Sequence, residues 1–412
     1  MTKVVVVGAG FAGVWTAAGI VRQAELHGGN ADPIQVTVVA PNDDLVIRPR
    51  LYEDDPQSMR VPLDRTLGPI GVKRVAATVT EINTVDHTVT ALDREARVVQ
   101  LPYDRLVLAA GSSLVRPQLQ GSEHLFDVDS MPAAARLHAH INNLGRWADH
   151  TDGSDAPTES HHPGQFTAVV VGGGFTGLEV ATELPRRLAE VAGDHPVRVI
   201  LVDRAEELAA PLGEGPRPTI AAALDQHGVE VRQGASVESL TTESVTLTGG
   251  EVIPASTVIW TAGMRASSLT DQVPGERDKL GRLVVDSTLR VIGVPDVYAT
   301  GDCAAAQADA EHLAMQACQH AVPLGKHAGH NVAADLLGRE TAEFAPDQYV
   351  TCLDLGPGEA VFTTGWDREV QMTGQEAKAL KSQINTEWIY PPVDDRQAIL
   401  DLADHRRTWP ID

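Results

Sequence analysis

Two glycine-rich segments of this 412-residue chain have a spacing suited to binding the phosphates of a dinucleotide. Gly8–Gly13 reads Gly-Ala-Gly-Phe-Ala-Gly, and Gly172–Gly177 reads Gly-Gly-Gly-Phe-Thr-Gly. The first glycine of such a segment permits a tight turn, the second lets a diphosphate approach the backbone, and the third lets helix and strand pack closely. The phosphates then lie at a helix N-terminus, where free N–H groups and the helix dipole favour negative charge.

Each segment also has the neighbours that this chemistry requires. The apolar runs Val4–Val7 and Val169–Val171 precede the two segments, and helix-forming residues follow both. One Gly-x-Gly-x-x-Gly segment is a weak signal, but two of them, each after a strand and before a helix, meet the structural context of the motif. A chain with two dinucleotide sites most simply moves electrons between two dinucleotides.

The remaining pattern predicts strands and helices that repeat the same order twice. Short apolar, β-branched runs bounded by turn residues predict strands. These runs are Lys3–Val7, Ile34–Val39, Val75–Ile82, Thr88–Leu92, Arg105–Ala109, Ala168–Val171, Val197–Val202, Val229–Arg232, Val245–Leu247, Val252–Ile253, Thr257–Trp260, Leu283–Val285, Val297–Ala299, Leu353–Leu355 and Ala360–Phe362. Helices are predicted after each glycine segment, the first to about Leu26 and the second with a kink near Pro185. Leu313–Leu337 is also predicted to be helical, with a disturbance at Pro323.

The residue that ends the second strand of each unit should bind the adenosine ribose, and here the two units differ. Asp203 ends that strand in the second unit, whereas Ala40 stands there in the first. A carboxylate at Asp203 favours NADH over NADPH, although Arg204 beside it could accept a 2′-phosphate. The first site lacks this hydrogen bond to the ribose unless the side chain of Asn42 or Asp43 reaches it.

Three further residues lie near the predicted turns. Two of them are candidate functional residues, and the third is a cysteine that could be mistaken for a redox thiol. Asp302, after Thr300-Gly301, can bind a polyol hydroxyl. Glu179 lies two residues past the second glycine segment, where it is either a carboxylate stabilised by the helix dipole or a residue near the nicotinamide. Cys303 is interpreted as a small packed residue, because no second cysteine lies near it in the sequence.

Composition and charge argue against several classes of partner and site. The formal charge of −23 argues against nucleic acid and anionic membrane surfaces as partners. The three cysteines show no metal spacing, and no apolar run reaches the roughly 20 residues of a membrane-spanning helix. No metal site is predicted, and a cytoplasmic location is expected. A polar stretch from Ala148 to Gln165 predicts a mobile loop, whose histidines (His150, His161 and His162) are expected to be solvated.

Taken together, these residues resemble the two-dinucleotide-domain flavoproteins, and within them the type II NADH dehydrogenases. The resemblance covers nearly the whole chain. It rests on both glycine segments and on Arg48–Tyr52, Tyr103–Gly111, Ile259–Gly263 and Tyr298–Asp302.

The resemblance implies FAD in the first unit and NADH in the second. The fold is then α/β, with two Rossmann-like domains, the second inserted in the first, and a small C-terminal α+β segment. The implied domains are 1–115 and 273–345 for FAD, 116–272 for NADH and 346–412 for the C-terminal domain. Glu179 and Gln319 are the implied catalytic residues. The implied cofactor-binding residues are Gly8, Gly10, Phe11, Ala12, Gly13, Ala40, Arg48, Val79, Ala110, Gly111, Gly301 and Asp302 for FAD, and Gly172, Gly174, Phe175, Thr176, Gly177, Asp203, Arg204, Ala262 and Gly263 for NADH.

Three features depart from the family. Ala40 replaces the ribose-binding acid, and Pro323-Leu324 replaces a Gln-Gln pair of the quinone site. The family's apolar, membrane-seating C-terminal helices are also absent. In their place, a helix is predicted from Thr373, which forms a capping box with Glu376, and Lys378 and Lys381 are its cations. We expect this tail to pack on a domain or on a second copy of the chain, with no stable membrane anchor.

The sequence therefore predicts an FAD-dependent oxidoreductase that accepts hydride from NADH and passes electrons to a quinone or another small acceptor. Disulfide reduction and sulfide oxidation are disfavoured, because no cysteine precedes Cys303. The acidic charge disfavours an acidic electron-carrier protein as acceptor. Two alternatives stay open: a redox-sensing or partner protein that holds FAD and NADH without a dedicated acceptor, and a flavin reductase in a specialised pathway.

Overall fold

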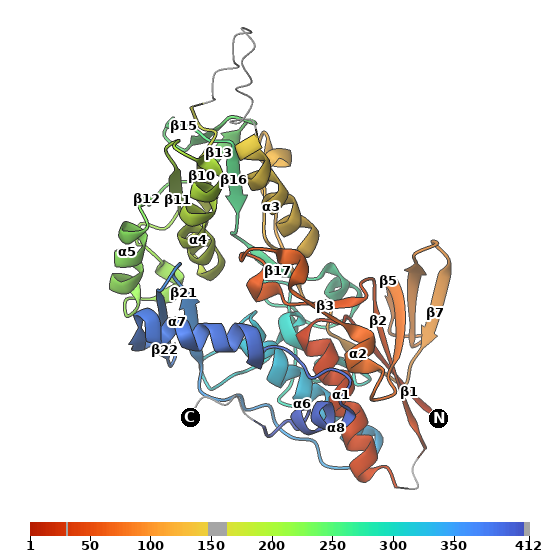
Figure 1. Cartoon of the computed structure of the whole chain (residues 1–412). Coiled ribbons are helices and arrows are strands. Elements are labelled where there is room, and N and C mark those ends of the chain that lie inside the picture. Colours follow the sequence, from red (N-terminus) through yellow and green to blue (C-terminus); the bar gives the residue numbers. More distant parts are fainter. Residues whose placement is uncertain (30–31, 147–162, 408–412) are drawn as a thin grey trace.

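The largest sheet gathers strands from the first 108 residues and one strand, β19, from much later in the chain. The computed structural model describes residues 1–29, 32–146 and 163–407 (Figure 1). This sheet has the order β19-β8-β1-β2-β5-β6-β7. Its strands are β1 Thr2–Val7, β2 Ile34–Ala40, β5 Lys73–Asn83, β6 Thr88–Asp93, β7 Val98–Pro102, β8 Arg105–Leu108 and β19 Val297–Ala299. The strands from β19 to β5 are parallel, whereas β6 and β7 continue from β5 as an antiparallel meander.

The second glycine segment belongs to a separate parallel sheet. The strands of this sheet lie between β8 and β19 in the sequence. Its order is β12-β11-β10-β16, with bounds Val229–Arg232, Arg198–Val202, Thr167–Val171 and Thr257–Trp260. A three-stranded antiparallel sheet, β13 Val237–Leu240, β14 Ser244–Leu247 and β15 Val252–Pro254, accompanies it. Helices α3 Met131–Arg146, α4 Phe175–Ala192 and α5 Arg217–Gln226 belong to this half of the molecule (Figure 1). The predicted α/β fold with two dinucleotide-type units is confirmed, and the domain boundaries stay predictions.

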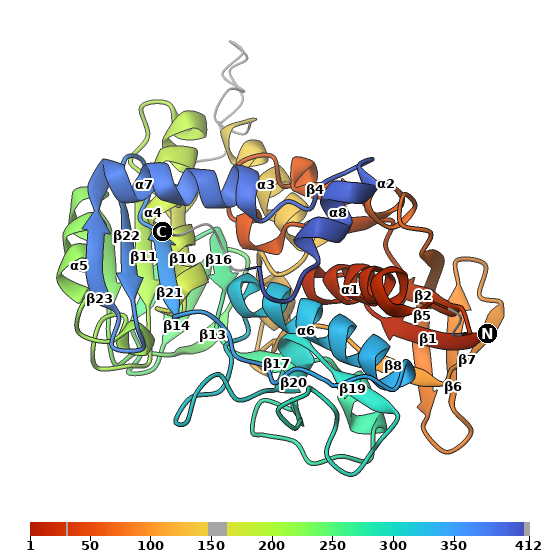
Figure 2. The same cartoon turned by 90° about the horizontal axis from the view of Figure 1, so that it is seen from below.

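Helices α1 Phe11–His27 and α6 Cys318–Leu336 lie side by side over the first sheet (Figure 2). Glycines make this close packing possible. A Cβ added at Gly325 would lie 2.4 Å from the Ala12 oxygen, and one at Gly329 would lie 2.4 Å from the Thr16 oxygen. The Thr16 hydroxyl donates to the Gly325 carbonyl at 3.1 Å. The two helices are thereby fixed against each other.

The C-terminal segment packs on its own chain rather than standing free. A sheet of β21 Val350–Asp354, β22 Ala360–Thr364 and β23 Glu369–Thr373 carries α7 Gly374–Gln383 and lies beside the second unit (Figure 2). A π-helical turn, Ile384–Trp388, and helix α8 Arg396–Leu402 follow, and α8 contacts α1. The expectation that the tail packs on a domain is met within a single chain.

Several short elements complete the chain. They are β3 Asp44–Val46, β4 Arg60–Pro62, α2 Leu63–Leu67, β9 Ser112–Leu114, β17 Met264–Ala266, β18 Leu283–Val284 and β20 Ala304–Ala305. The pairing of β9 with β17 links the two segments that connect the halves of the molecule.

Three local expectations were wrong. Helix α6 begins at Cys318 rather than Leu313, because the preceding residues form bends and a bridge. The helix is continuous through Pro323, whose position in the second turn removes only one early hydrogen bond. The predicted capping box of α7 does not form, since the Thr373 side chain makes no capping hydrogen bond. Most of the polar stretch Ala148–Gln165, with His150, His161 and His162, lies outside the described part of the chain.

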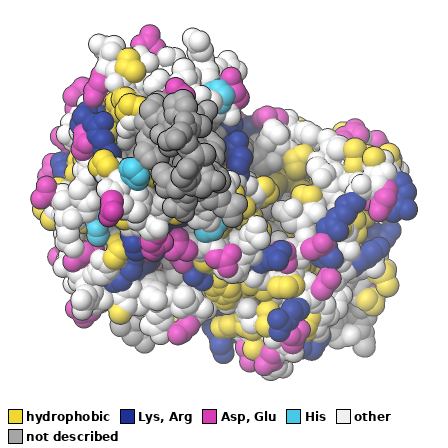
Figure 3. Space-filling model, turned by 45° about the horizontal axis from the view of Figure 1, so that its top comes forward, with side chains coloured by type: hydrophobic (Ala, Val, Ile, Leu, Met, Phe, Trp, Pro, Cys, Tyr) yellow, Lys and Arg dark blue, Asp and Glu magenta, His cyan; other side chains and the backbone are white. Residues whose placement is uncertain are grey.

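The surface mixes charges despite the net charge of −23. On the face shown in Figure 3, acidic and basic side chains are interspersed rather than segregated. Within residues 1–29, 32–146 and 163–407, no helix is long and apolar enough to cross a bilayer.

One buried histidine makes the packing of the C-terminal sheet sensitive to pH. His320 Nδ1 accepts the Met315 N–H at 3.1 Å, and its ring stacks on Tyr349 of the C-terminal segment. Burial lowers the pKa of His320 from 6.5 to about 4. The neutral ring is therefore favoured in the folded protein, so its contribution to stability is present above pH 6.5 and is lost as the pH falls toward 4.

We predict that His320→Gln reduces the loss of unfolding free energy between pH 7 and pH 5 by about 2 kcal/mol. The unfolded histidine takes up a proton over this range, whereas glutamine can accept the Met315 N–H without titrating. Urea unfolding at the two pH values, followed by circular dichroism, measures the effect. The exposed His124 provides the control variant, His124→Gln. An undiminished pH dependence in His320→Gln would show that this ring does not hold the sheet.

Candidate active site

The three glycines of the first segment have three different surroundings. Gly8 has φ +107°, and a Cβ there would lie 2.2 Å from the Ala109 oxygen. A Cβ on Gly13 would lie 2.0 Å from the Gly8 oxygen, so α1 can approach β1 only if this position has no side chain. A Cβ added at Gly10 would meet no atom of a more distant residue within 4 Å. The first and third glycines are thus required by packing, and the second leaves open space at the N-terminus of α1.

The second segment reproduces this arrangement. Gly172 has φ +115°, and a Cβ on it would lie 2.9 Å from the Thr261 hydroxyl oxygen. A Cβ on Gly177 would lie 1.8 Å from the Gly172 oxygen, whereas Gly174 again faces open space. Phe175 is half-buried and Thr176 is exposed in the first turn of α4. Both helix N-termini therefore offer free space for a diphosphate, and this space fits the dinucleotides that the sequence predicts.

The other predicted residues of the first site lie on the carboxyl edge of the first sheet. Val7 of β1 pairs with Val39 and Leu108, and Leu108 pairs with Ala299. The segments that follow these strands therefore meet, and they carry the first glycine motif, Ala40, Ala110, Gly111, Gly301 and Asp302. A Cβ on Gly301 would lie 2.7 Å from the Ala12 side chain, which places Asp302 beside the first turn of α1. Ala40 pairs with Ala76 of β5, and Val79 lies three residues farther along that strand.

The second site is assembled in the same way. Val171 pairs with Val202 and Trp260, so the turns after these strands adjoin. The carboxylate of Asp203 accepts the Gly173 N–H at 2.6 Å and the Ala205 N–H at 3.0 Å. Arg204 is exposed. Ala262 and Gly263 follow β16, and the Ala262 carbonyl accepts the Trp260 ring N–H at 2.7 Å.

The structure shows which of the two residues, Asn42 or Asp43, is better placed to bind a ribose next to Ala40. Asp43 accepts from Arg74 at 2.8 Å and from Arg94 at 2.5 Å. Hydrogen bonds from Arg94 and Arg74 hold the pKa of Asp43 below its usual value. Because Asp43 is engaged with two guanidinium groups, the exposed Asn42 is the better placed of the two substitutes.

Asp302 belongs to a polar cluster that sequence reasoning found only in part. The Ser112 hydroxyl donates to Asp302 Oδ2 at 2.6 Å, and Arg48 donates to Ser112 Oγ at 3.1 Å. Arg48 also forms an ion pair with Asp129 and lies 3.7 Å from Asp302. Burial raises the pKa of Asp302, against the hydrogen bond from Ser112 and the charge of Arg48. Ser112 follows Gly111 directly and could have been found from the sequence, whereas nothing in the local pattern marked Asp129.

Glu179 is buried in an ion pair with the C-terminal helix. The Lys381 Nζ lies 2.8 Å from Glu179 Oε1 and donates at 3.0 Å to the Cys352 carbonyl. Both side chains are nearly inaccessible, at 8% residue exposure each. Glu179 Oε1 also accepts the Asp354 N–H at 3.3 Å. Lys381, which the sequence presented as a surface cation, is instead an internal partner of a predicted catalytic residue.

The pair binds protons tightly. Burial raises the pKa of Glu179, and Lys381 opposes this only in part. Burial alone would lower the pKa of Lys381, yet the charge of Glu179 raises it above its ordinary value. At neutral pH Lys381 therefore keeps its proton, and Glu179 takes one up at a higher pH than an exposed glutamate.

A second polar contact extends this cluster toward the first unit. The Tyr52 hydroxyl donates to Asp354 Oδ2 at 2.9 Å, and Lys378 donates to Asp354 Oδ1 at 2.5 Å. Burial raises the pKa of Tyr52 well above its usual value, so the phenol remains a donor. Lys378, like Lys381, is thus engaged within the chain.

Gln319 lies in the first turn of α6 and faces the C-terminal sheet. With its amide nitrogen toward the Val350 carbonyl, the two contacts to Val350 measure 2.5 Å to the oxygen and 3.0 Å to the nitrogen. Its neighbour Gln316 donates to the Asp302 carbonyl at 3.2 Å. The first turn of α6 is therefore attached to both Asp302 and β21.

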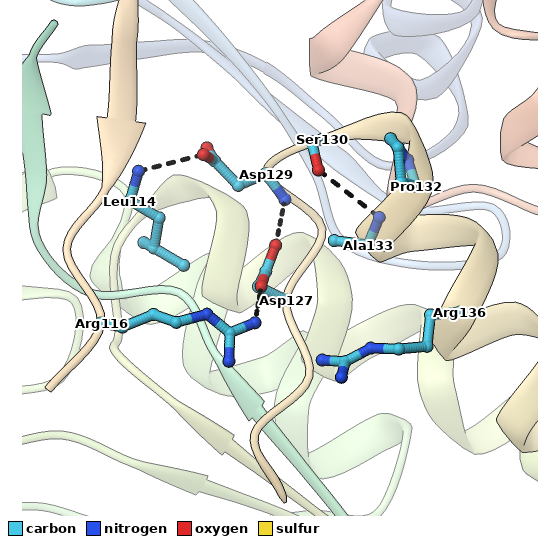
Figure 4. A pocket seen from close by; sticks show the side chains of 8 residues that line it. All are labelled: Leu114, Arg116, Asp127, Asp129, Ser130, Pro132, Ala133 and Arg136. Atoms are coloured by element: carbon cyan, nitrogen blue, oxygen red, sulfur yellow. Dashed lines mark hydrogen bonds and ion pairs between the residues drawn. The ribbon is translucent and has the colours of Figure 1, made fainter. Parts of the chain in front are cut away.

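A hollow of about 430 Å³ adjoins the Arg48 cluster through Asp129 (Figure 4). Its walls are the linkers between the two units and the start of α3. The lining residues are Leu114, Arg116, Asp127, Asp129, Ser130, Pro132, Ala133 and Arg136. Arg116 pairs with Asp127 at 2.5 Å, so the charges of this hollow largely neutralise one another. The hollow does not include either glycine motif.

We predict that Gly10→Ala and Gly174→Ala fold normally but each weakens one dinucleotide by about tenfold, or 1.4 kcal/mol. A methyl group at either position enters free space rather than protein. Flavin content per chain measures the first effect, and the Michaelis constant for NADH measures the second. Gly13→Ala is the contrasting variant, because its methyl group meets the Gly8 carbonyl and should prevent normal folding. Equal effects of Gly10→Ala and Gly174→Ala on both ligands would contradict separate sites.

We predict that Lys381→Met lowers the free energy of unfolding by about 3–5 kcal/mol, because it leaves the Glu179 carboxylate buried without its partner. The double variant Glu179→Gln/Lys381→Met should recover most of this loss. Lys279→Met is the control, because it removes a lysine at an exposed site, and it should cost about 0.5 kcal/mol or less. Urea unfolding of the wild type, of Glu179→Gln and Lys381→Met separately, and of the double variant gives the coupling energy. Additive effects of the two substitutions would show that the pair is not coupled.

Comparison with known proteins agrees with this geometry. Residues 2–325 match the pyridine nucleotide-disulphide oxidoreductase family. The chain is 44% identical, over all of both lengths, to an NADH dehydrogenase-like protein of Mycobacterium tuberculosis. It is 26% identical to a type II NADH:quinone oxidoreductase of Staphylococcus saprophyticus, over 94% of this chain and 95% of the relative. The structure of NDH2 from Plasmodium falciparum in complex with NADH superposes with a TM-score of 0.76 at 14% identity, covering 98% and 97% of the two chains.

Proposed function

Because the chain belongs to the pyridine nucleotide-disulphide oxidoreductase family, we propose that it passes the electrons of NADH, by way of FAD, to a quinone. The observation that carries the proposal is the repeated glycine geometry, with free space at Gly10 and at Gly174. The names of relatives, type II NADH:quinone oxidoreductase and demethylphylloquinone reductase, support a quinone as the acceptor. The net reaction would be NADH + H⁺ + quinone giving NAD⁺ and quinol. A cytoplasmic location and a homodimer are compatible with this role and are not needed for it.

The residues divide the work according to their positions. The N-terminus of α1 receives the diphosphate of FAD, and Asp302 with Ser112 and Arg48 receives the polyol chain next to it. The N-terminus of α4 receives NADH, with Asp203 placed for the ribose hydroxyls. FAD, when bound, supplies the acceptor for a hydride and a store for two electrons.

Glu179, paired with Lys381, supplies a carboxyl group that can exchange a proton beside the first turn of α4. Reduction of a quinone consumes two protons as well as two electrons, and the structure holds these groups out of water. Lys381 stays protonated, and the raised pKa of Glu179 lets the pair gain a second proton. Gln319 positions the start of α6 by its contacts with Val350.

The proposal is tested with the purified protein, NADH and separate acceptors: a menaquinone analogue, a ubiquinone analogue, oxygen and ferricyanide. We expect one quinone to be reduced per NADH, at a rate well above that with oxygen. A protein that is reduced by NADH but passes electrons to none of these acceptors would contradict the proposal. Such a result would favour the redox-sensing alternative.

We predict a preference for NADH over NADPH, because a 2′-phosphate would face the carboxylate of Asp203. Asp203→Ala should shrink this preference by about tenfold, since Arg204 would remain to receive the phosphate. Catalytic efficiency with both cofactors measures the ratio. Asp225→Ala, an exposed change in the same unit, should leave the ratio unchanged. Faster reduction of the wild type by NADPH would overturn the assignment.

A further inference from the structure

Arg368 is held in an unusual position by the turn between β22 and β23. It has φ +52°, which is uncommon for a residue other than glycine. Its N–H donates to the Gly365 carbonyl at 3.1 Å. A Cβ on Gly215 would lie 2.5 Å from the Arg368 oxygen, so the turn is in close contact with the loop before α5. The C-terminal sheet lies beside the second dinucleotide unit (Figure 2), and its turn brings Arg368 close to that unit at Gly215.

The guanidinium group of Arg368 lies near two aromatic rings. Its central carbon is 5.9 Å from the centre of the Phe175 ring and 5.5 Å from that of Tyr349. One terminal nitrogen donates to the Tyr349 hydroxyl at a long 3.4 Å. The Nε is buried without a hydrogen-bond partner, and no carboxylate of the described residues forms an ion pair with this arginine. Because its charge is not paired with a carboxylate, the guanidinium keeps terminal N–H donors that can bind an anionic ligand.

The guanidinium group of Arg368 lies over the ring of Phe175, at the end of α4 that offers space for an anion. Phe175 is the first residue of α4, and Gly174 before it faces open space. The diphosphate of a dinucleotide carries two negative charges, and a guanidinium group binds such oxygens with paired, charge-assisted hydrogen bonds. Arg368 and the N–H groups of α4 therefore have complementary roles toward one ligand.

We propose that Arg368 binds the diphosphate of NADH at the N-terminus of α4, so that the C-terminal sheet completes the NADH site. This inference rests on the proposed NADH site in the second unit. It assigns to the C-terminal segment a binding role in addition to its packing. The contact with Phe175 aligns the guanidinium, and the contact with Gly215 fixes the turn that carries it.

The test compares Arg368→Met and Arg368→Lys with the wild-type holoprotein. Titration calorimetry with ADP-ribose measures binding of the diphosphate end without any flavin reduction. We expect Arg368→Met to weaken ADP-ribose and to raise the Michaelis constant for NADH by about tenfold or more, with Arg368→Lys in between. Arg339→Met removes the same charge at an exposed site after α6 and should match the wild type.

A second hydride donor separates binding from folding. A dihydronicotinamide that lacks phosphates, such as 1-benzyl-1,4-dihydronicotinamide, should reduce the flavin of all variants at similar rates. Equal loss with this donor and with NADH would overturn the proposal in favour of a structural role, as would unchanged ADP-ribose binding in Arg368→Met. If Arg368→Met fails to fold, Arg368→Gln replaces it. Wild-type affinity of that variant for ADP-ribose would then overturn the proposal. A wild type that binds neither ADP-ribose nor NADH would contradict the proposed function itself.

Discussion

The close approach of each glycine-bearing helix to its strand is the constraint on which the rest of the structure depends. In both units the third glycine lies against the carbonyl of the first, where a Cβ would come within 2.0 Å or 1.8 Å of the oxygen. This contact fixes where α1 and α4 begin relative to β1 and β10. The free N–H groups of both helices are consequently presented at the carboxyl edges of the two sheets. The residues after the neighbouring strands reach the same edges because the strands are parallel and in register.

A buried ion pair connects this framework to the end of the chain. Lys381 contacts Glu179 across 202 positions of sequence, and the same strand that holds Lys381 also contacts Gln319. The C-terminal segment is therefore part of the site in both proposals made above. A buried pair of this kind is expensive to desolvate, so removing one partner costs more than replacing both.

The fold was largely predictable because its signals are local. Apolar runs such as Val4–Val7 and the glycine spacing after them specify a strand, a turn and a helix within 15 residues. The site was predictable only where it is built from such turns, as at Asp203 and Asp302. Lys381 was interpreted as a surface cation because helical periodicity shows which residues share a face but not which distant group covers it. The start of α6 was missed because apolar residues from Leu313 onward continue the helical pattern, although their backbone forms bends instead.

The central claim, that two dinucleotides act together on one chain, is tested most directly by an anaerobic titration of the purified protein with NADH. The flavin absorbance is recorded after each addition, and the flavin content per chain is determined after denaturation. We predict one releasable FAD per chain and complete bleaching with one equivalent of NADH. A protein without flavin, or a bound flavin that NADH does not reduce, would contradict the account.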